Sequence, residues 1–177
     1  ACDARNVSLQ TIAIEKDHLT VSRFEAMQQR FNAAFTEIDT TLSSMRVVKS
    51  EEELQKMREA AKLADYAIEV GINALQEGRT EMDVLNIIES AVKAKGYSMS
   101  FDTMVLAGEK TASPHGTPGN RPIRRGDMIL FDLGVVYEGY CSDITRTVAF
   151  GDVTDAQAKL YDAVLRANEA AIAAVKP

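Results

Sequence analysis

The fold of this chain is decided by residues 128–148, which read MILFDLGVVY (128–137), EG (138–139) and YCSDITRTV (140–148). Two runs rich in β-branched and aromatic residues flank a pair that favours a tight turn. Glu-Gly is a weaker turn signal than Asn-Gly or Asp-Gly, but it still predicts an antiparallel hairpin. Each predicted strand carries one carboxylate, Asp132 in the first and Asp143 in the second.

The hairpin turn sets the relation between the two carboxylates. If Tyr137 faces Tyr140, then Asp143 faces Gly134, and Asp132 lies two residues further along on the same face of the sheet. Such diagonal neighbours are about 7–8 Å apart, which lets both carboxylates reach one ion. Gly134 leaves room beside them. A three-residue loop in place of the tight turn would break this register.

Two carboxylates that share an apolar sheet repel each other and lose hydration. A shared proton, a neighbouring Arg or Lys, or a divalent cation relieves this. Arg146 has the opposite parity to Asp143 and is expected to face the other side. A surface hairpin with solvated Asp residues is the alternative interpretation. Hard oxygen ligands suit Mn²⁺, Mg²⁺ or Ca²⁺, and Co²⁺ or Zn²⁺ once an imidazole joins them.

A loop rich in proline and glycine, residues 107–127, precedes this hairpin and contains His115. Long ordered loops of this composition are often functional. His115 is therefore a candidate for substrate contact or proton handling, with a purely structural role as the alternative. His18, among charged and polar neighbours, is interpreted as a surface residue.

The rest of the chain predicts an α+β fold, with an antiparallel sheet covered by helices on one face. Apolar stripes with capping signals predict helices that pack against the core, and residues 39–49 are interpreted as a connector. A boundary near residue 45 would make the preceding part the tail of a larger N-terminal unit. The predicted helices run over 22–38, 50–78, 80–96 and 154–175, and the strands over 11–14, 99–106, 128–137 and 141–149.

Composition narrows the function classes. The 177 residues are 46% hydrophobic and 26% charged, with a net charge of −6, which argues against binding to nucleic acid or to anionic membranes. No apolar run reaches the length of a transmembrane helix, and the first residues do not resemble a signal peptide. Cys2 and Cys141 make a poor disulfide framework, so a reducing, cytoplasmic location is expected.

Several motifs together resemble the catalytic domain of Xaa-Pro dipeptidases and aminopeptidases P, a superfamily that includes methionine aminopeptidase and creatinase. The resemblance covers residues 46–177, while residues 1–45 resemble the end of that family's creatinase-type N-terminal domain. The motifs are PHGTP (114–118), RP (121–122), GD (126–127), FDLG (131–134) and YCSDITRT (140–147).

The resemblance implies a pita-bread fold and a centre of two divalent metals, with Mn²⁺ or Co²⁺ expected and Zn²⁺ as an alternative. Asp132 and Asp143 would be the first two ligands, with Asp143 bridging the metals. His115 would hydrogen-bond the substrate and stabilise the tetrahedral intermediate. Thr145 would support Asp143 without binding a metal itself. The implied substrate is a small peptide with proline in second position, and the complete protein would be a homodimer.

The sequence departs from the family pattern after Asp143. No histidine follows, and the one later glutamate is Glu169 within a predicted helix. The family's remaining His and two Glu ligands are absent, so we expect the chain to be the N-terminal half of the catalytic domain and inactive by itself. A creatinase-like amidinohydrolase and a non-catalytic pita-bread binding protein are the alternatives.

Overall fold

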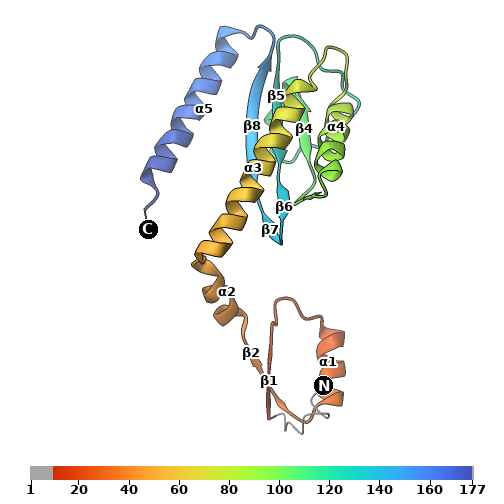
Figure 1. Cartoon of the computed structure of the whole chain (residues 1–177), viewed down its shortest axis with the longest axis vertical. Helices are drawn as coiled ribbons and strands as arrows, with labels where there is room; N and C mark the ends of the chain where they lie inside the picture. The colour runs from red at the N-terminus through yellow and green to blue at the C-terminus, as the bar shows by residue number, and fades with distance from the viewer. Residues whose placement is uncertain (1–9, 177) are drawn as a thin grey trace. The chain divides into compact units, whose positions relative to one another are not determined.

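The computed structural model describes residues 10–176, so Cys2 lies outside the described part. The chain divides into two compact units, one ending at Glu51 and the other beginning at Glu52 (Figure 1). The first unit holds β1 (Thr11–Ile14), α1 (Val21–Arg30), β2 (Ala34–Glu37) and α2 (Asp39–Val47). The second holds α3 (Glu51–Asn73) apart from its first residue, α4 (Glu81–Ala94), β3 (Ser98–Met99), β4 (Met104–Ala107), the 3-10 helix η2 (Gly108–Ala112), β5 (Asp127–Leu133), β6 (Val135–Tyr137), β7 (Tyr140–Cys141), β8 (Ile144–Phe150) and α5 (Asp155–Ala174).

The first unit corrects two sequence predictions. The helix predicted over 22–38 ends at Arg30, and β2 follows and pairs in parallel with β1. The prediction placed Phe24 and Phe35 on one apolar face of a single helix. They belong instead to α1 and β2, where their rings pack edge to face with centroids 5.3 Å apart. The predicted connector over 39–49 is mostly the helix α2.

In the second unit, β4, β5 and β8 form an antiparallel sheet in which β5 is central. Residues Ile129, Phe131 and Leu133 of β5 are fully buried on the face that α3 and α4 cover. The helices contribute mainly small and branched side chains to this core, including Ala64, Ile68, Val84, Ile88 and Val92. The predicted α+β arrangement, with helices on one face of an antiparallel sheet, is confirmed.

Each of the three long predicted strands is interrupted at the same level of the sheet. The strand predicted over 99–106 breaks at 100–103, the one over 128–137 breaks at 134, and the one over 141–149 breaks at 142–143. On the other side of these breaks, β3, β6 and β7 form a second, small sheet. At this level Gly134 closely approaches the neighbouring chain segment, since an added Cβ would lie 1.9 Å from the carbonyl oxygen of Ser142. The Ser100 hydroxyl donates a hydrogen bond to that same carbonyl at 2.9 Å.

The helix starts of the second unit follow the predicted capping signals. Thr80 with Asp83, and Thr154 with Gln157, form reciprocal capping boxes at the starts of α4 and α5.

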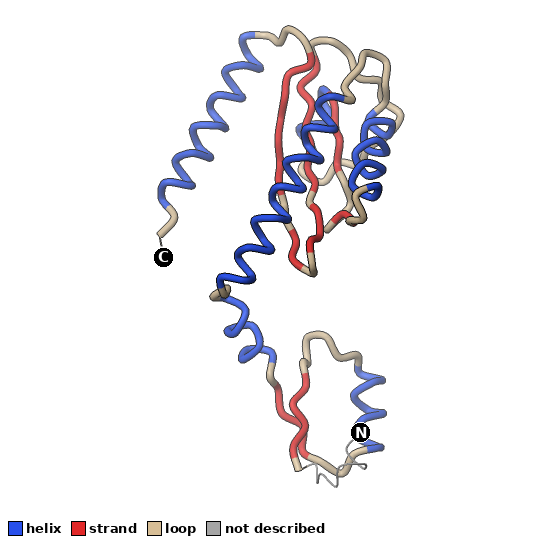
Figure 2. The backbone as a smooth tube through the Cα atoms, in the orientation of Figure 1, coloured by secondary structure: helices blue, strands red, loops and turns tan. Residues whose placement is uncertain are grey.

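The core packing predicted for the last helix is wrong. No residue of α5 is buried, and Leu160 is 67% exposed. Figure 2 shows α5 as a separate rod after the end of β8. Within residues 10–176, no helix has both the length and the apolar character needed to cross a bilayer.

Candidate metal site

The hairpin that carries the two aspartates closes as the sequence predicts. Tyr137 pairs with Tyr140, so Glu138 and Gly139 form a two-residue turn. Both turn residues have positive φ, 47° for Glu138 and 84° for Gly139. This is the backbone of the primed turns, whose twist matches that of the strands they connect.

The register predicted from this turn is confirmed on both sides of the interruption. Val136 pairs with Cys141 before it, and Leu133 pairs with Ile144 after it. Asp143 therefore lies across from Gly134, one step diagonally from Asp132. Asp132 is half-buried and Asp143 is exposed.

Thr145 lies directly opposite Asp132 and donates a hydrogen bond from its hydroxyl to Asp132 Oδ1 at 3.1 Å. The expectation assigned Thr145 to Asp143, and the structure pairs it with the other aspartate instead. The register explains this, because Thr145 is the cross-strand partner of Asp132. One carboxylate oxygen of Asp132 is thereby oriented by its neighbour.

Arg146 is placed on the other face, as its parity predicts. It pairs with Phe131, whose side chain lies in the core, and its guanidinium donates to the carbonyl of Thr145 at 2.9 Å. Its parity therefore directs Arg146 away from the side on which Asp132 lies.

The loop that carries His115 reaches the Asp132 side of the sheet. Leu106 pairs with Leu130, and both therefore share the face of Asp132. Leu106 is nonetheless fully buried, since Gly116 packs on it so closely that an added Cβ would lie 2.7 Å from Leu106 Cδ1. His115, the neighbour of Gly116, is exposed. The fold thus brings the imidazole-bearing loop over the face that carries Asp132.

An ion pair anchors the end of this loop. The two guanidinium nitrogens Nη1 and Nη2 of Arg121 donate to the two carboxylate oxygens of Asp127 at 2.8 and 2.9 Å. This bidentate pairing holds the pKa of Asp127 below its usual range. Sequence reasoning did not single out this pair, although the RP and GD motifs contain both residues.

Sequence reasoning also missed Glu81, which is fully buried beneath the same loop. Glu81 is the first residue of α4, where an acidic side chain is ordinarily explained by the helix dipole. From the sequence alone, Glu81 is therefore indistinguishable from an ordinary acidic residue that stabilises a helix start.

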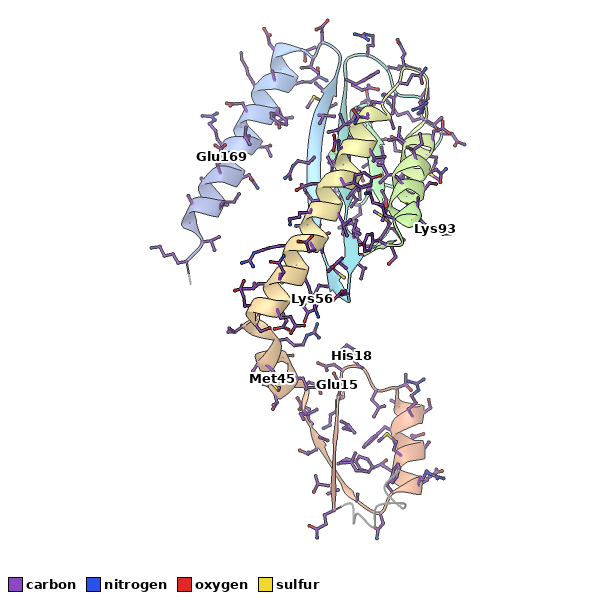
Figure 3. The ribbon with its side chains drawn as sticks, in the orientation of Figure 1. Glu15, His18, Met45, Lys56, Lys93 and Glu169 are labelled. Atoms are coloured by element: carbon purple, nitrogen blue, oxygen red, sulfur yellow. The ribbon has the colours of Figure 1, made fainter. Side chains whose placement is uncertain are left out.

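The donor set fits part of a metal centre. Two carboxylates, one on β5 and one in the break between β7 and β8, are hard ligands suited to divalent cations, but the described residues contain no cluster of three or more His, Cys, Asp or Glu that could hold an ion. Glu169 lies on α5 and not on the hairpin that carries the aspartates (Figure 3). His18 is exposed in the first unit, in agreement with its interpretation as a surface residue.

Comparison with known proteins agrees with this architecture. Metallopeptidase family M24 matches residues 55–177, and the Creatinase/Prolidase N-terminal domain matches residues 1–48. The putative dipeptidase YkvY of Bacillus subtilis is 48% identical over 179 residues, covering 100% of this chain and 49% of the relative. The chain therefore spans about half the length of the curated relatives it matches.

Two solved structures share the fold. The Xaa-Pro dipeptidase from Bacillus anthracis is 36% identical, with a TM-score of 0.84 over 89% of this chain and 45% of that one. The X-Pro aminopeptidase from Thermotoga maritima is 32% identical, with a TM-score of 0.87 over 95% of this chain and 48% of that one. The fold defines a pita-bread half-domain of the peptidase type. The chain belongs to metallopeptidase family M24.

Proposed function

We propose that this chain supplies the aspartate half of the binuclear metal centre of a proline-specific peptidase, which hydrolyses the Xaa-Pro bond of small peptides. The observation that carries the proposal is the hairpin register, which sets Asp143, in the break between β7 and β8, diagonally beside Asp132 of β5. The names of the dipeptidase and aminopeptidase relatives support the substrate class.

Each residue has a distinct role in this proposal. Asp132 and Asp143 hold divalent cations, with Mn²⁺ or Co²⁺ favoured over Zn²⁺, and Thr145 orients the carboxylate of Asp132. The bound cations supply activation of water and polarisation of the scissile carbonyl. His115 donates a hydrogen bond to the substrate and stabilises the negative charge that develops on the carbonyl oxygen.

The proposal requires further ligands that this sequence does not contain. No histidine and no glutamate other than Glu169 follow Asp143. Two carboxylates alone hold a transition metal weakly, so the 177-residue chain is inactive without a second half. We further propose that the complete enzyme is a cytoplasmic homodimer, because Cys2 and Cys141 make a poor disulfide framework for an oxidising compartment.

The test is a fusion of this chain to the C-terminal half of the Bacillus subtilis relative. The fusion, loaded with Mn²⁺ or Co²⁺, is expected to cleave an Xaa-Pro dipeptide or an Xaa-Pro-Xaa tripeptide, while the chain alone cleaves neither. Asp132→Asn and Asp143→Asn are expected to abolish metal binding, measured by calorimetry, together with turnover. His115→Ala is expected to lower kcat by about 10²–10³-fold with the metals retained.

Two outcomes contradict the proposal. Robust metal-dependent cleavage by the chain alone would show that no second half is needed. Full activity of the Asp132→Asn fusion would exclude the aspartate pair from the site. Metal-free hydrolysis of creatine by the fusion would instead support the amidinohydrolase alternative, and the intact aspartate pair argues against that result.

A further inference from the structure

A buried carboxylate lies at the base of the His115 loop. The side chain of Glu81 has no solvent exposure. Its Oε1 accepts a hydrogen bond from the backbone N–H of Ala107 at 2.8 Å, and its Oε2 accepts one from the N–H of Gly119 at 2.9 Å. The ammonium of Lys110 pairs with the same Oε2. The side chain of Glu81 thus connects the end of β4, the helix η2 and the part of the loop that follows His115.

Lys110 extends this contact across the loop. Besides Glu81, its ammonium donates to the carbonyl of Thr117 at 2.9 Å. Lys110 precedes His115 in the chain, while Thr117 and Gly119 follow it. The loop is therefore fixed on both sides of the imidazole through a single carboxylate and its counter-charge.

The start of α4 receives support in return. The N–H of Glu81 donates to the carbonyl of Arg121 at 3.2 Å, and the N–H of Met82 donates to that of Gly119 at 3.2 Å. These amides have no partner within the helix itself, because they belong to its first turn. The loop caps the helix, and the first side chain of the helix holds the loop.

A full charge is buried at this depth only if its hydrogen bonds and its counter-ion compensate the lost hydration. Glu81 has both, and its partners converge on the segment 107–119. We propose that Glu81 is a positioning residue, which through Lys110 fixes this segment and so sets the position of His115 above the aspartate face. The part of this inference that concerns catalysis rests on the proposed function.

Substitution by glutamine separates this role from simple packing. Glu81→Gln preserves the volume, but it replaces one acceptor oxygen by an NH₂ group. The NH₂ group must then point either at the N–H of Ala107, or at the N–H of Gly119 and the ammonium of Lys110. All three are donors, so the NH₂ group cannot accept the hydrogen bonds that the carboxylate oxygen accepted. The loop is therefore expected to be released while the apolar core stays intact.

The first experiment measures amide hydrogen exchange on the 177-residue chain. Glu81→Gln is expected to speed exchange in residues 107–119 by roughly tenfold or more, with β5 unchanged. Glu69→Gln, the same change on the exposed surface of α3, is the matched control and should leave the segment unchanged. Unchanged exchange in the Glu81→Gln chain would overturn the proposal.

Lys110 provides a second variant in case Glu81→Gln does not fold. Lys110→Met removes the ammonium of Lys110, which is partly exposed, and leaves Glu81 in place. It is expected to loosen the same segment. Lys110→Arg keeps the charge and should restore protection. If Lys110→Met and Lys110→Arg behave alike, the charge pairing is not what holds the loop, and the proposal fails.

The catalytic consequence is measured in the fusion enzyme. Glu81→Gln is expected to lower kcat by about 10²-fold through misplacement of His115, with KM and metal affinity nearly unchanged. Retention of full kcat alongside faster loop exchange would overturn the positioning role. An inactive wild-type fusion would contradict the proposed function instead, and the exchange result would still decide whether Glu81 holds the loop.

Discussion

The two faces of the sheet β4–β5–β8 differ in what they contact. On the covered face, Ile129, Phe131 and Leu133 are fully buried against α3 and α4. On the other face, Asp132 and Thr145 form a polar contact, and the loop around Gly116 covers only part of the surface. Alternation along one strand therefore separates the residues that stabilise the fold from those assigned to chemistry.

The largest expected effect comes from the covered face. Phe131→Ala removes a fully buried ring and leaves a cavity, so we expect a loss of about 3–5 kcal/mol in the free energy of unfolding. Urea denaturation followed by circular dichroism measures it. A loss below about 1 kcal/mol would mean that this face is not the core.

The second-largest loss of stability is expected at Gly134, where the strands are interrupted. Gly134→Ala forces a Cβ against the carbonyl of Ser142 and is expected to destabilise the chain by about 2–3 kcal/mol. Gly139→Ala is the control, since its Cβ would meet no atom within 4 Å and only the strain of its positive φ remains. Equal losses in both variants would argue against the close approach.

The ion pair at the end of the loop predicts a pH-dependent effect. Asp127→Asn is expected to cost about 1–2 kcal/mol at neutral pH, because Arg121 loses its charged partner. The pKa of Asp127 is lower in the folded chain than in the unfolded chain, so its contribution is complete above the unfolded pKa of about 3.9. It disappears as the pH falls through the folded pKa.

Parallel urea titrations of the wild type and Asp127→Asn at several pH values test this. The difference in unfolding free energy between them should stay constant from neutral pH to about 5 and shrink at lower pH. A difference that grows towards acid pH would have the wrong sign for a carboxylate whose pKa is lowered.

The smallest effect on stability is expected at the aspartate itself. Asp132→Asn keeps an acceptor for Thr145 in a half-buried position, so we expect a change within about 0.5 kcal/mol. The same variant should lose metal binding in the fusion enzyme. A large destabilisation would make Asp132 a structural residue and weaken its assignment as a ligand.

Local signals allowed much of this fold to be predicted. The turn at Glu138-Gly139 fixed the register, and the pairs Thr80/Asp83 and Thr154/Gln157 marked two helix starts. These features depend on neighbours within a few residues, which a sequence displays directly.

The predictions failed where distant residues decide the structure. Phe24 and Phe35 meet across a helix and a strand, and their spacing imitated one long helix. Leu160 belongs to an amphipathic stripe, yet periodicity does not reveal whether a partner surface is present. The partners of Glu81 lie far along the chain, so only the structure distinguishes it from an ordinary acidic residue at a helix start. The chemical roles of Asp132, Asp143 and His115 remain predictions.

The reciprocal capping of α4 and the loop also has a consequence for the order of folding. The last turn of α4 closes through local bonds, as between the N–H of Lys95 and the carbonyl of Val92. In its first turn the Thr80/Asp83 box is local, but the N–H groups of Glu81 and Met82 depend on the carbonyls of Arg121 and Gly119. A long segment must therefore close before these two amides find acceptors. We therefore expect the two ends of this helix to form at different times, with the end that holds the His115 loop forming late.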